Sequence, residues 1–299
     1  MKHFMMDRDP PAGRKQYRLG LLTLVAESTV PATRFEGWLP RTGDSAEHPA
    51  EIELWIGGSE KRDSCLGGSK LVPGGVAVRF DEAAGRASLR SPAGYAELDL
   101  AERWGRVSPR DGTAYLHALL SACAAILMGR AGVVLVDASA IIDSSGGGWM
   151  IVGPREDRSA LVRAFLADGC HYVSDDQVVV RPARNQPGLI VIESWHRQHE
   201  AIPPERWRPV ARLRGILLAR AIVTRTPLPW RQASRDQALA SLLDASPHLV
   251  SDPVTEEPLR ELLASCVSRP AVTALISRGI ATPPGGAVRQ LAAVVEAMT

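Results

Sequence analysis

The sequence lacks closely spaced cysteines, a long hydrophobic run and a recognisable leader. Its four cysteines are far apart and none forms a C-x-x-C pair, which argues against a disulfide framework or a cysteine-based zinc site. The longest apolar run, "YLHALLSACAAILM", is interrupted by a histidine and is too short to span a bilayer. Nothing at the N-terminus resembles a signal peptide. These absences predict a cytoplasmic protein that does not use a membrane as a partner.

An excess of charge of one sign is also missing. The chain has 35 basic and 33 acidic side chains, a net charge of +2, so no bulk field favours binding to nucleic acid. With 45% hydrophobic and 23% charged residues among its 299, it has the composition of an ordinary globular protein. The class of partner must therefore be inferred from individual sites.

Three sections follow one another along the chain. Residues 1–15 contain prolines and charges without a period, which predicts a flexible tail. Residues 16–110 consist of short apolar runs broken by turn residues, and "VAVRF" and "ASLRS" alternate around "DEAAG" as in a hairpin. This section is predicted to be β-rich. Residues 111–299 contain longer helical and strand patterns and are predicted to form an α/β core.

The core begins with a helical stripe that runs from Leu116 to Leu127. Two buried strands follow, at residues 133–142 and 149–152, with the glycine-rich turn "SSGGG" between them. Residues 159–168 form an amphipathic pattern that Gly169 ends, and residues 171–180 again read as a strand. This order predicts a sheet covered by helices.

The segment "GPREDRS" lies where a strand gives way to a helix, the position of a phosphate-binding loop. Such a loop, G-x-x-x-x-G-K-[ST], directs backbone N–H groups at the anion and adds a lysine and a metal-binding hydroxyl. Here Gly153 matches the first glycine and Ser159 the hydroxyl, while Asp157 and Arg158 stand at the second glycine and the lysine. The segment is also one residue short. By itself it is ordinary in any α/β protein.

A pair of acids follows the next predicted strand element. Asp175 and Asp176 stand within "VSDDQVVV", directly after the first crossover helix. Adjacent carboxylates at a strand end suit magnesium binding and proton abstraction from a hydroxyl. The acids therefore favour phosphoryl transfer more than the loop does alone.

Together these segments resemble a known family. The run "VVLVDASAIIDSSGGGWMIVGPREDRSALVRAFLADGCHYVSDDQVVV" is similar to the catalytic core of HPr kinase/phosphorylase and the smaller HPr-kinase-like proteins, some of which accompany peptide-modification genes. The resemblance is good over residues 114–180 and loose beyond. It implies a P-loop-type, phosphoenolpyruvate-carboxykinase-like α/β core that transfers phosphate from a nucleotide to a serine of a protein or peptide.

The resemblance also implies roles for individual residues. Asp175 and Asp176 match the acidic pair, one as the base and the other as a magnesium ligand. Ser159 matches the second metal ligand, and Gly153, Arg158 and Ser159 would contact the nucleotide. Asp137 stands where the family has a histidine near the transferred phosphate, so it belongs to the implied catalytic set.

The departures from the family pattern weaken nucleotide binding. An arginine fork is not interchangeable with the compact ammonium of lysine. Asp157 places a negative charge and a side chain where phosphate and bare backbone belong. This degenerate Walker A loop predicts that binding of ATP and Mg²⁺ is weak or lost.

Two hypotheses follow. In the favoured one, the chain is a pseudokinase-like module that binds a peptide or protein, with nucleotide-dependent serine phosphorylation weakened or lost. In the alternative, it is an active, divergent ATP-dependent serine kinase, for example of a precursor peptide. Neither hypothesis involves nucleic acid or a membrane, and self-association into a homo-oligomer stays open.

Overall fold

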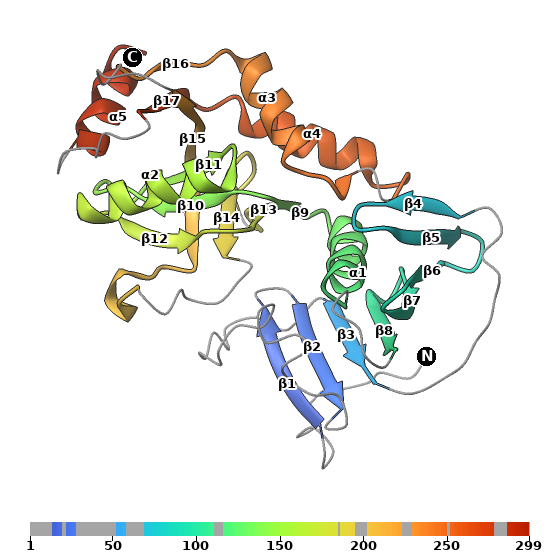
Figure 1. Cartoon of the computed structure of the whole chain (residues 1–299). Coiled ribbons are helices and arrows are strands. Elements are labelled where there is room, and N and C mark those ends of the chain that lie inside the picture. Colours follow the sequence, from blue (N-terminus) through green and yellow to red (C-terminus); the bar gives the residue numbers. More distant parts are fainter. Residues whose placement is uncertain are drawn as a thin grey trace. The chain divides into compact units, whose positions relative to one another are not determined.

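The computed structural model describes ten stretches of the chain: residues 14–19, 22–27, 52–57, 69–110, 116–184, 186–194, 202–222, 229–249, 252–277 and 286–298. The chain divides into two compact units, Met1–Leu127 and Met128–Thr299. The described residues form a mixed α/β protein with two β-sheets and five α-helices (Figure 1).

The first unit contains an eight-stranded sheet of order β1-β2-β3-β8-β7-β6-β5-β4. The predicted hairpin is confirmed, because β5 and β6 pair antiparallel with Asp81 opposite Arg86. The predicted tail lies outside the described residues except for its last two, which begin β1. The strands are β1 (Arg14–Leu19), β2 (Leu22–Glu27), β3 (Ile52–Ile56), β4 (Lys70–Val72), β5 (Val76–Asp81), β6 (Arg86–Ser91), β7 (Gly94–Asp99) and β8 (Trp104–Pro109).

The helical stripe predicted after this section is confirmed as α1 (Leu116–Arg130). Every predicted stripe residue is buried, and so are several alanines between them. The helix ends where Gly132 adopts a φ of +72°, a conformation that glycine enters without steric cost. The boundary between the two units falls inside α1, after Leu127.

The second unit contains a nine-stranded sheet in which β12-β10-β11-β15-β14-β13-β9 are consecutive neighbours and β17 pairs with both β15 and β16. Its strands are β9 (Val134–Val136), β10 (Ser139–Ile142), β11 (Gly148–Val152), β12 (His171–Ser174), β13 (Val178–Pro182), β14 (Ile190–Ser194), β15 (Val210–Ile222), β16 (Arg231–Gln232) and β17 (Ala271–Ser277). Its helices are α2 (Arg155–Ala167), α3 (Arg235–Asp244), α4 (Glu256–Cys266) and α5 (Gly286–Glu296), with a short 3₁₀ turn at Pro204–Arg206.

Two strands predicted to be continuous are each broken in two. Residues 133–142 divide at Asp137 into β9 and β10, and residues 171–180 divide at residues 175–177 into β12 and β13. In each case the two halves have different partners. β9 pairs with β13, whereas β10 pairs with β11 and β12. Continuous apolar runs do not reveal such a division, because both halves are buried.

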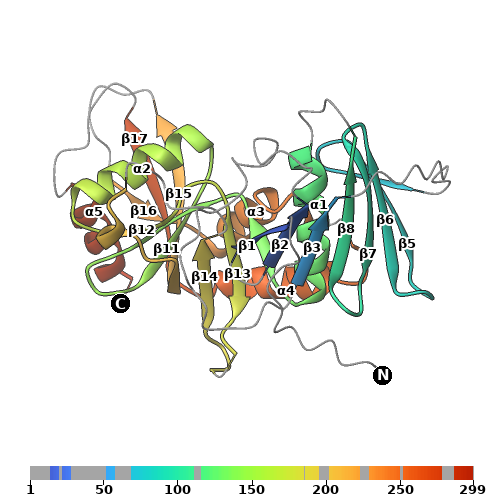
Figure 2. The same cartoon turned by 90° about the horizontal axis from the view of Figure 1, so that it is seen from below.

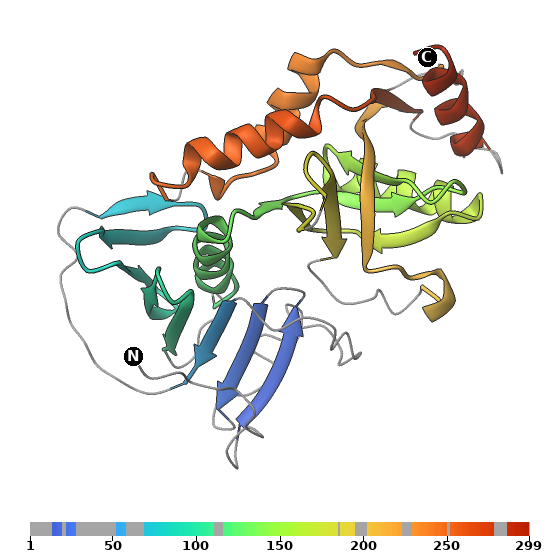
Figure 3. The ribbon, with the colours of Figure 1, turned by 180° about the vertical axis from the view of Figure 1, so that it is seen from behind.

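Strand β15 joins the two parts of this sheet (Figure 3). Its first residues pair antiparallel with β14, and its later residues pair parallel with β11 on one side and β17 on the other. A strand of 13 residues is long enough to belong to both parts. Consequently the end of β11, where α2 begins, lies beside the C-terminal half of β15.

Helices cover both faces of the β11-β15-β17 region, as the sequence predicts (Figure 2). On one face, Trp149 and Ile151 of β11 pack in a core with α2 and α5. On the other, Met150 and Val152 pack in a core with α3 and α4. Successive strand residues point to opposite faces, so both faces must be apolar to be covered.

Gly169 ends α2 as predicted, with a φ of +89°. The N–H of Cys170 donates to the carbonyl of Phe165 at 3.0 Å, a hydrogen bond typical of a glycine C-cap. No helix of the described stretches combines the length and apolar character needed to cross a membrane. Cys123, Cys170 and Cys266 are buried thiols without a disulfide.

The packing of β11 against β15 predicts the effect of one substitution. A Cβ at Gly215 would lie 2.7 Å from the carbonyl oxygen of Pro270 and would overlap the Trp149 ring. We expect Gly215→Ala to lower the free energy of unfolding by about 1–3 kcal/mol, because rigid neighbours on both sides prevent relaxation. Urea unfolding measures the loss. The exposed control Ala240→Ser should stay within about 0.5 kcal/mol of wild type, and an equal loss in both variants would contradict the explanation.

Candidate functional site

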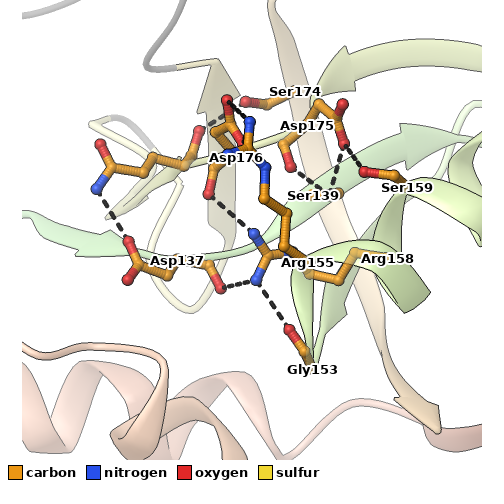
Figure 4. A network of polar contacts seen from close by, with 10 residues as sticks. Asp137, Ser139, Gly153, Arg155, Arg158, Ser159, Ser174, Asp175 and Asp176 are labelled. Carbon is orange, nitrogen blue, oxygen red and sulfur yellow. Dashed lines mark hydrogen bonds and ion pairs between the residues drawn. The ribbon is translucent and has the colours of Figure 1, made fainter. Parts of the chain in front are cut away.

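The predicted site residues meet where the two strand breaks lie beside the start of α2 (Figure 4). Asp137 lies at the first break, and Asp175 and Asp176 at the second. Gly153 follows β11, and Arg158 and Ser159 belong to the first turns of α2. Residues that are up to 39 positions apart are therefore brought together by the strand order β12-β10-β11.

Arg158 is at the centre of this arrangement, with only 7% of its surface exposed. Its Nη1 donates to the backbone carbonyls of Gly153 at 2.8 Å and Asp137 at 3.2 Å, and its Nη2 donates to the carbonyl of Asp176 at 3.4 Å. All three carbonyls lie outside the strand ladders. A single guanidinium therefore supplies donors to one carbonyl at each strand break and to the carbonyl of Gly153, between β11 and α2.

Two serines satisfy the remaining carbonyls of the second break. Ser139 Oγ donates to the carbonyl of Asp175, and Ser174 Oγ donates to the carbonyl of Gln177, each at 2.6 Å. Buried carbonyls without donors would each cost about 1–3 kcal/mol. Each of the three carbonyls at residues 175–177 therefore accepts a hydrogen bond from a side chain.

Three carboxylates surround the Arg158 guanidinium. Burial lowers the pKa of Arg158 from its ordinary value, and the negative charges of Asp137, Asp176 and Asp175 oppose that shift. Because an arginine keeps its proton in proteins, Arg158 is a permanent cation among these acids. Its Nε is buried and has no hydrogen-bond partner among the described residues.

The three carboxylates make different contacts. Asp175 Oδ1 accepts from Ser159 Oγ at 3.1 Å and lies 3.3 Å from Ser139 Oγ, whose single proton is donated to the Asp175 carbonyl. Asp137 Oδ1 accepts from Gln177 Nε2 at 2.9 Å, which joins the two strand breaks. The third, Asp176, forms an ion pair with Arg155, in which Nη2 lies 2.9 Å from Oδ1.

Residues 153–159 were expected to form a degenerate loop ahead of a helix that begins at residue 159, and this helix start is wrong. Helix α2 begins at Arg155, directly after the N-cap Pro154, so Asp157 and Arg158 lie inside its first turn. Asp157 is buried, and its Oδ2 accepts from the N–H of Ala221 at 3.1 Å. Helix α2 is thereby tied to the C-terminal end of β15.

Gly153 is explained by the same packing against β15. Its φ is +140°, and a Cβ there would lie 2.5 Å from the carbonyl oxygen of Ala219. Glycine is thus required at this position by backbone conformation and by the neighbouring strand. The phosphate-loop pattern suggested that Gly153 binds a nucleotide. The packing against β15 is sufficient to explain why a glycine stands there.

Five further residues belong to the site and were not predicted. Ser139, Arg155, Ser174 and Gln177 are close in sequence to predicted residues, so their proximity was an available signal. No pattern in the sequence pointed to His248, which follows α3. Its Nδ1 is buried without a partner, and burial lowers its pKa while the charge of Asp137 opposes the shift. Only tertiary structure brings His248 to Asp137.

Comparisons with known proteins do not assign the chain to a family. No protein-family model and no curated protein matches the chain. Among solved structures, it is similar to the Hpr(Ser) kinase/phosphatase from Coxiella burnetii, with a TM-score of 0.30 and 12% identity, over 54% of this chain and 98% of that chain. A likeness of this strength supports no conclusion about family, activity or site residues.

The contacts of Arg158 predict that it stabilises the second unit. We expect Arg158→Met to lower the free energy of unfolding by about 2–4 kcal/mol, because three carbonyls lose their donors and the acids lose their buried cation. Thermal or urea unfolding checks this value. The matched control Arg163→Met changes an exposed arginine of the same helix and should alter stability by less than about 0.5 kcal/mol. A loss no larger than the control's would refute the role of Arg158.

The environment of His248 predicts a pH dependence. Because its folded-state pKa is lowered, His248 is neutral in both states above about pH 6.5, and below that pH the unfolded chain takes up the proton first. Stability should therefore fall with decreasing pH, by at most about 1.4 kcal/mol per pH unit from this group. Denaturant unfolding between pH 7 and 5 should show a shallower fall for His248→Asn. An unchanged slope would mean that another group causes it.

Proposed function

We propose that this chain is an HPr-kinase-like, pseudokinase-like module that binds a peptide or protein partner, with nucleotide-dependent serine phosphorylation weakened or lost. The observation that carries the proposal is the position of Arg158. A cation tied to the backbone of three segments fills the centre of the site, between the acids and the start of α2.

The start of α2 does not fit a triphosphate. A phosphate cradle needs a loop whose N–H groups converge, ahead of a helix with a positive N-terminus. Here the helix begins two residues after β11, and its first turn contains Glu156 and Asp157. These carboxylates complement the helix dipole themselves and would repel an anion.

The residues implied as metal ligands are also engaged. The Ser159 hydroxyl donates to Asp175, which leaves its oxygen lone pairs available, whereas Asp176 pairs with Arg155. Arg158 supplies the positive charge that a magnesium ion would otherwise bring. The start of α2 and the buried Arg158 therefore do not fit a magnesium–ATP complex.

One observation favours the alternative of an active, divergent kinase. Asp175 is only partly buried, and no hydrogen bond from the described residues reaches its Oδ2. An aspartate in this state is able to act as a base toward a substrate hydroxyl. The position of Asp175 thus suits the alternative, whereas the helix start and Arg158 oppose it.

The proposal predicts that magnesium and ATP do not stabilise the protein. A ligand at 100 times its dissociation constant would add about 2.7 kcal/mol to the free energy of unfolding. We expect no shift in the melting temperature with millimolar ATP and Mg²⁺, and no transfer of labelled phosphate to a purified partner. Transfer that is lost in Asp175→Asn, a variant of nearly equal volume, would establish the active kinase instead.

A further inference from the structure

One glutamate of the first unit has a carboxylate oxygen without a donor. Glu53 lies on β3, where it alternates with the buried residues Ile52, Leu54 and Ile56 and therefore belongs to the opposite face of the sheet. Its side chain is half-buried, and its Oε1 is buried without a hydrogen-bond partner among the described residues. Such an atom is costly to leave unbonded. The position therefore lacks a hydrogen-bond donor.

The second oxygen of Glu53 is already bonded. Burial raises the pKa of Glu53, and a hydrogen bond from the Trp55 side chain opposes this shift. An indole has a single donor, its Nε1–H, and Oε1 has no partner, so the bond from Trp55 ends on Oε2. No ion pair of Glu53 occurs within the described stretches. The carboxylate thus has one fixed oxygen and one oxygen that can still accept.

An exposed tryptophan lies directly opposite this carboxylate. Strands β3 and β8 lie side by side and pair in parallel, with Glu53 in register with Trp104 (Figure 2). Trp104 is 41% exposed, and it is the aromatic member of the large hydrophobic side chains exposed in the described part of the chain. The face of an indole ring attracts a cation through its quadrupole. The carboxylate and the ring therefore favour the same kind of ligand.

The backbone fixes this juxtaposition. Arg103, directly before Trp104, has a φ of +55°, and within the described stretches every other residue with positive φ is a glycine. The carbonyl of Arg103 accepts from the N–H of Glu53 at 3.0 Å. A residue in this conformation persists only where the surrounding structure holds it. Trp104 thus enters β8 beside Glu53 because of the chain path.

The free oxygen selects among cations. A guanidinium binds a carboxylate best through both oxygens, and Oε2 already accepts from Trp55. A quaternary ammonium has no N–H and would leave Oε1 unbonded. A metal ion is disfavoured, because the described residues contain no group of three or more His, Cys, Asp or Glu that could hold one. A primary ammonium has a compact charge and N–H donors, so it suits both Oε1 and the indole face.

We propose that Glu53, Trp55 and Trp104 form a binding site for the primary ammonium group of a lysine side chain on a peptide or protein partner. The Trp104 ring moves aside to admit the ammonium, which donates one N–H to Glu53 Oε1. The inference rests on the proposed function for the existence of a peptide or protein partner, and it adds the group that is recognised. It involves none of the residues around Arg158.

An NMR titration of the full-length chain tests the inference through the indole N–H signals of Trp55 and Trp104. The probes are a capped Gly-Lys-Gly peptide and the same peptide with acetyllysine, trimethyllysine or arginine in place of lysine. The lysine peptide should shift both signals to saturation, and the uncharged acetyllysine peptide should shift neither. Trimethyllysine keeps the charge but has no donor, so its peptide should bind about three- to tenfold more weakly. The arginine peptide should also bind more weakly.

Variants assign the binding to this site. Glu53→Gln should weaken binding at least about tenfold, because a charge-assisted hydrogen bond is lost. Trp104→Ala should weaken it about two- to thirtyfold, the range of a cation–π contact, as measured from the Trp55 signal. The control Glu97→Gln makes the same change at an exposed carboxylate of β7 and should bind as the wild type does. Melting temperatures show whether each variant is folded.

Several results would overturn the inference. These are equal affinity for the acetyllysine, trimethyllysine or arginine peptide, and unchanged binding by a folded Glu53→Gln or Trp104→Ala. Tighter binding of n-butylamine than of the lysine peptide would overturn the assignment to a peptide or protein. ATP-dependent phosphate transfer would overturn the proposed loss of activity and leave the expected lysine binding unchanged. Absence of lysine binding would overturn this inference alone.

Discussion

The structure of the second unit depends on the contact between one arginine and three backbone carbonyls. The sheet changes its pairing at two neighbouring strand breaks, and each break leaves carbonyls outside the ladders. Arg158 reaches the carbonyls of Asp137, Asp176 and Gly153 from the first turn of α2. Without these donors, buried carbonyls would oppose the break in the sheet. A residue at the position of a nucleotide-binding lysine thus has a structural role.

The same contact explains why acids gather at this point. The breaks need residues that tolerate a bend and accept bonds from neighbouring side chains, and aspartate does both. Asp175 accepts from the Ser159 hydroxyl, and Asp137 accepts from an amide of the other break. A buried guanidinium in turn requires negative charge nearby. The acids and the buried arginine therefore stabilise one another.

What distinguishes a structural site from a binding site here is exposure. The buried half of the cluster is held by the hydrogen bonds of Arg158 to three backbone carbonyls, and among the described residues its Nε has no partner. The outer half, with Arg155 and Asp176, is exposed and weakly paired. The buried half contributes to the free energy of folding. The exposed half contributes little, because an exposed ion pair is weak.

The sequence by itself determined the elements whose signal is local. The hairpin of β5 and β6, the helix α1, the strand β11 and the glycine cap of α2 follow from periodicity and turn residues. The sequence also indicated that Asp175 and Asp176 belong to the same site as the segment "GPREDRS". Tertiary structure alone decided that two apolar runs break, that α2 starts at Arg155, and that His248 approaches Asp137. These outcomes depend on strand order and on the carbonyls left by each break, and neither is encoded in the pattern of neighbouring residues.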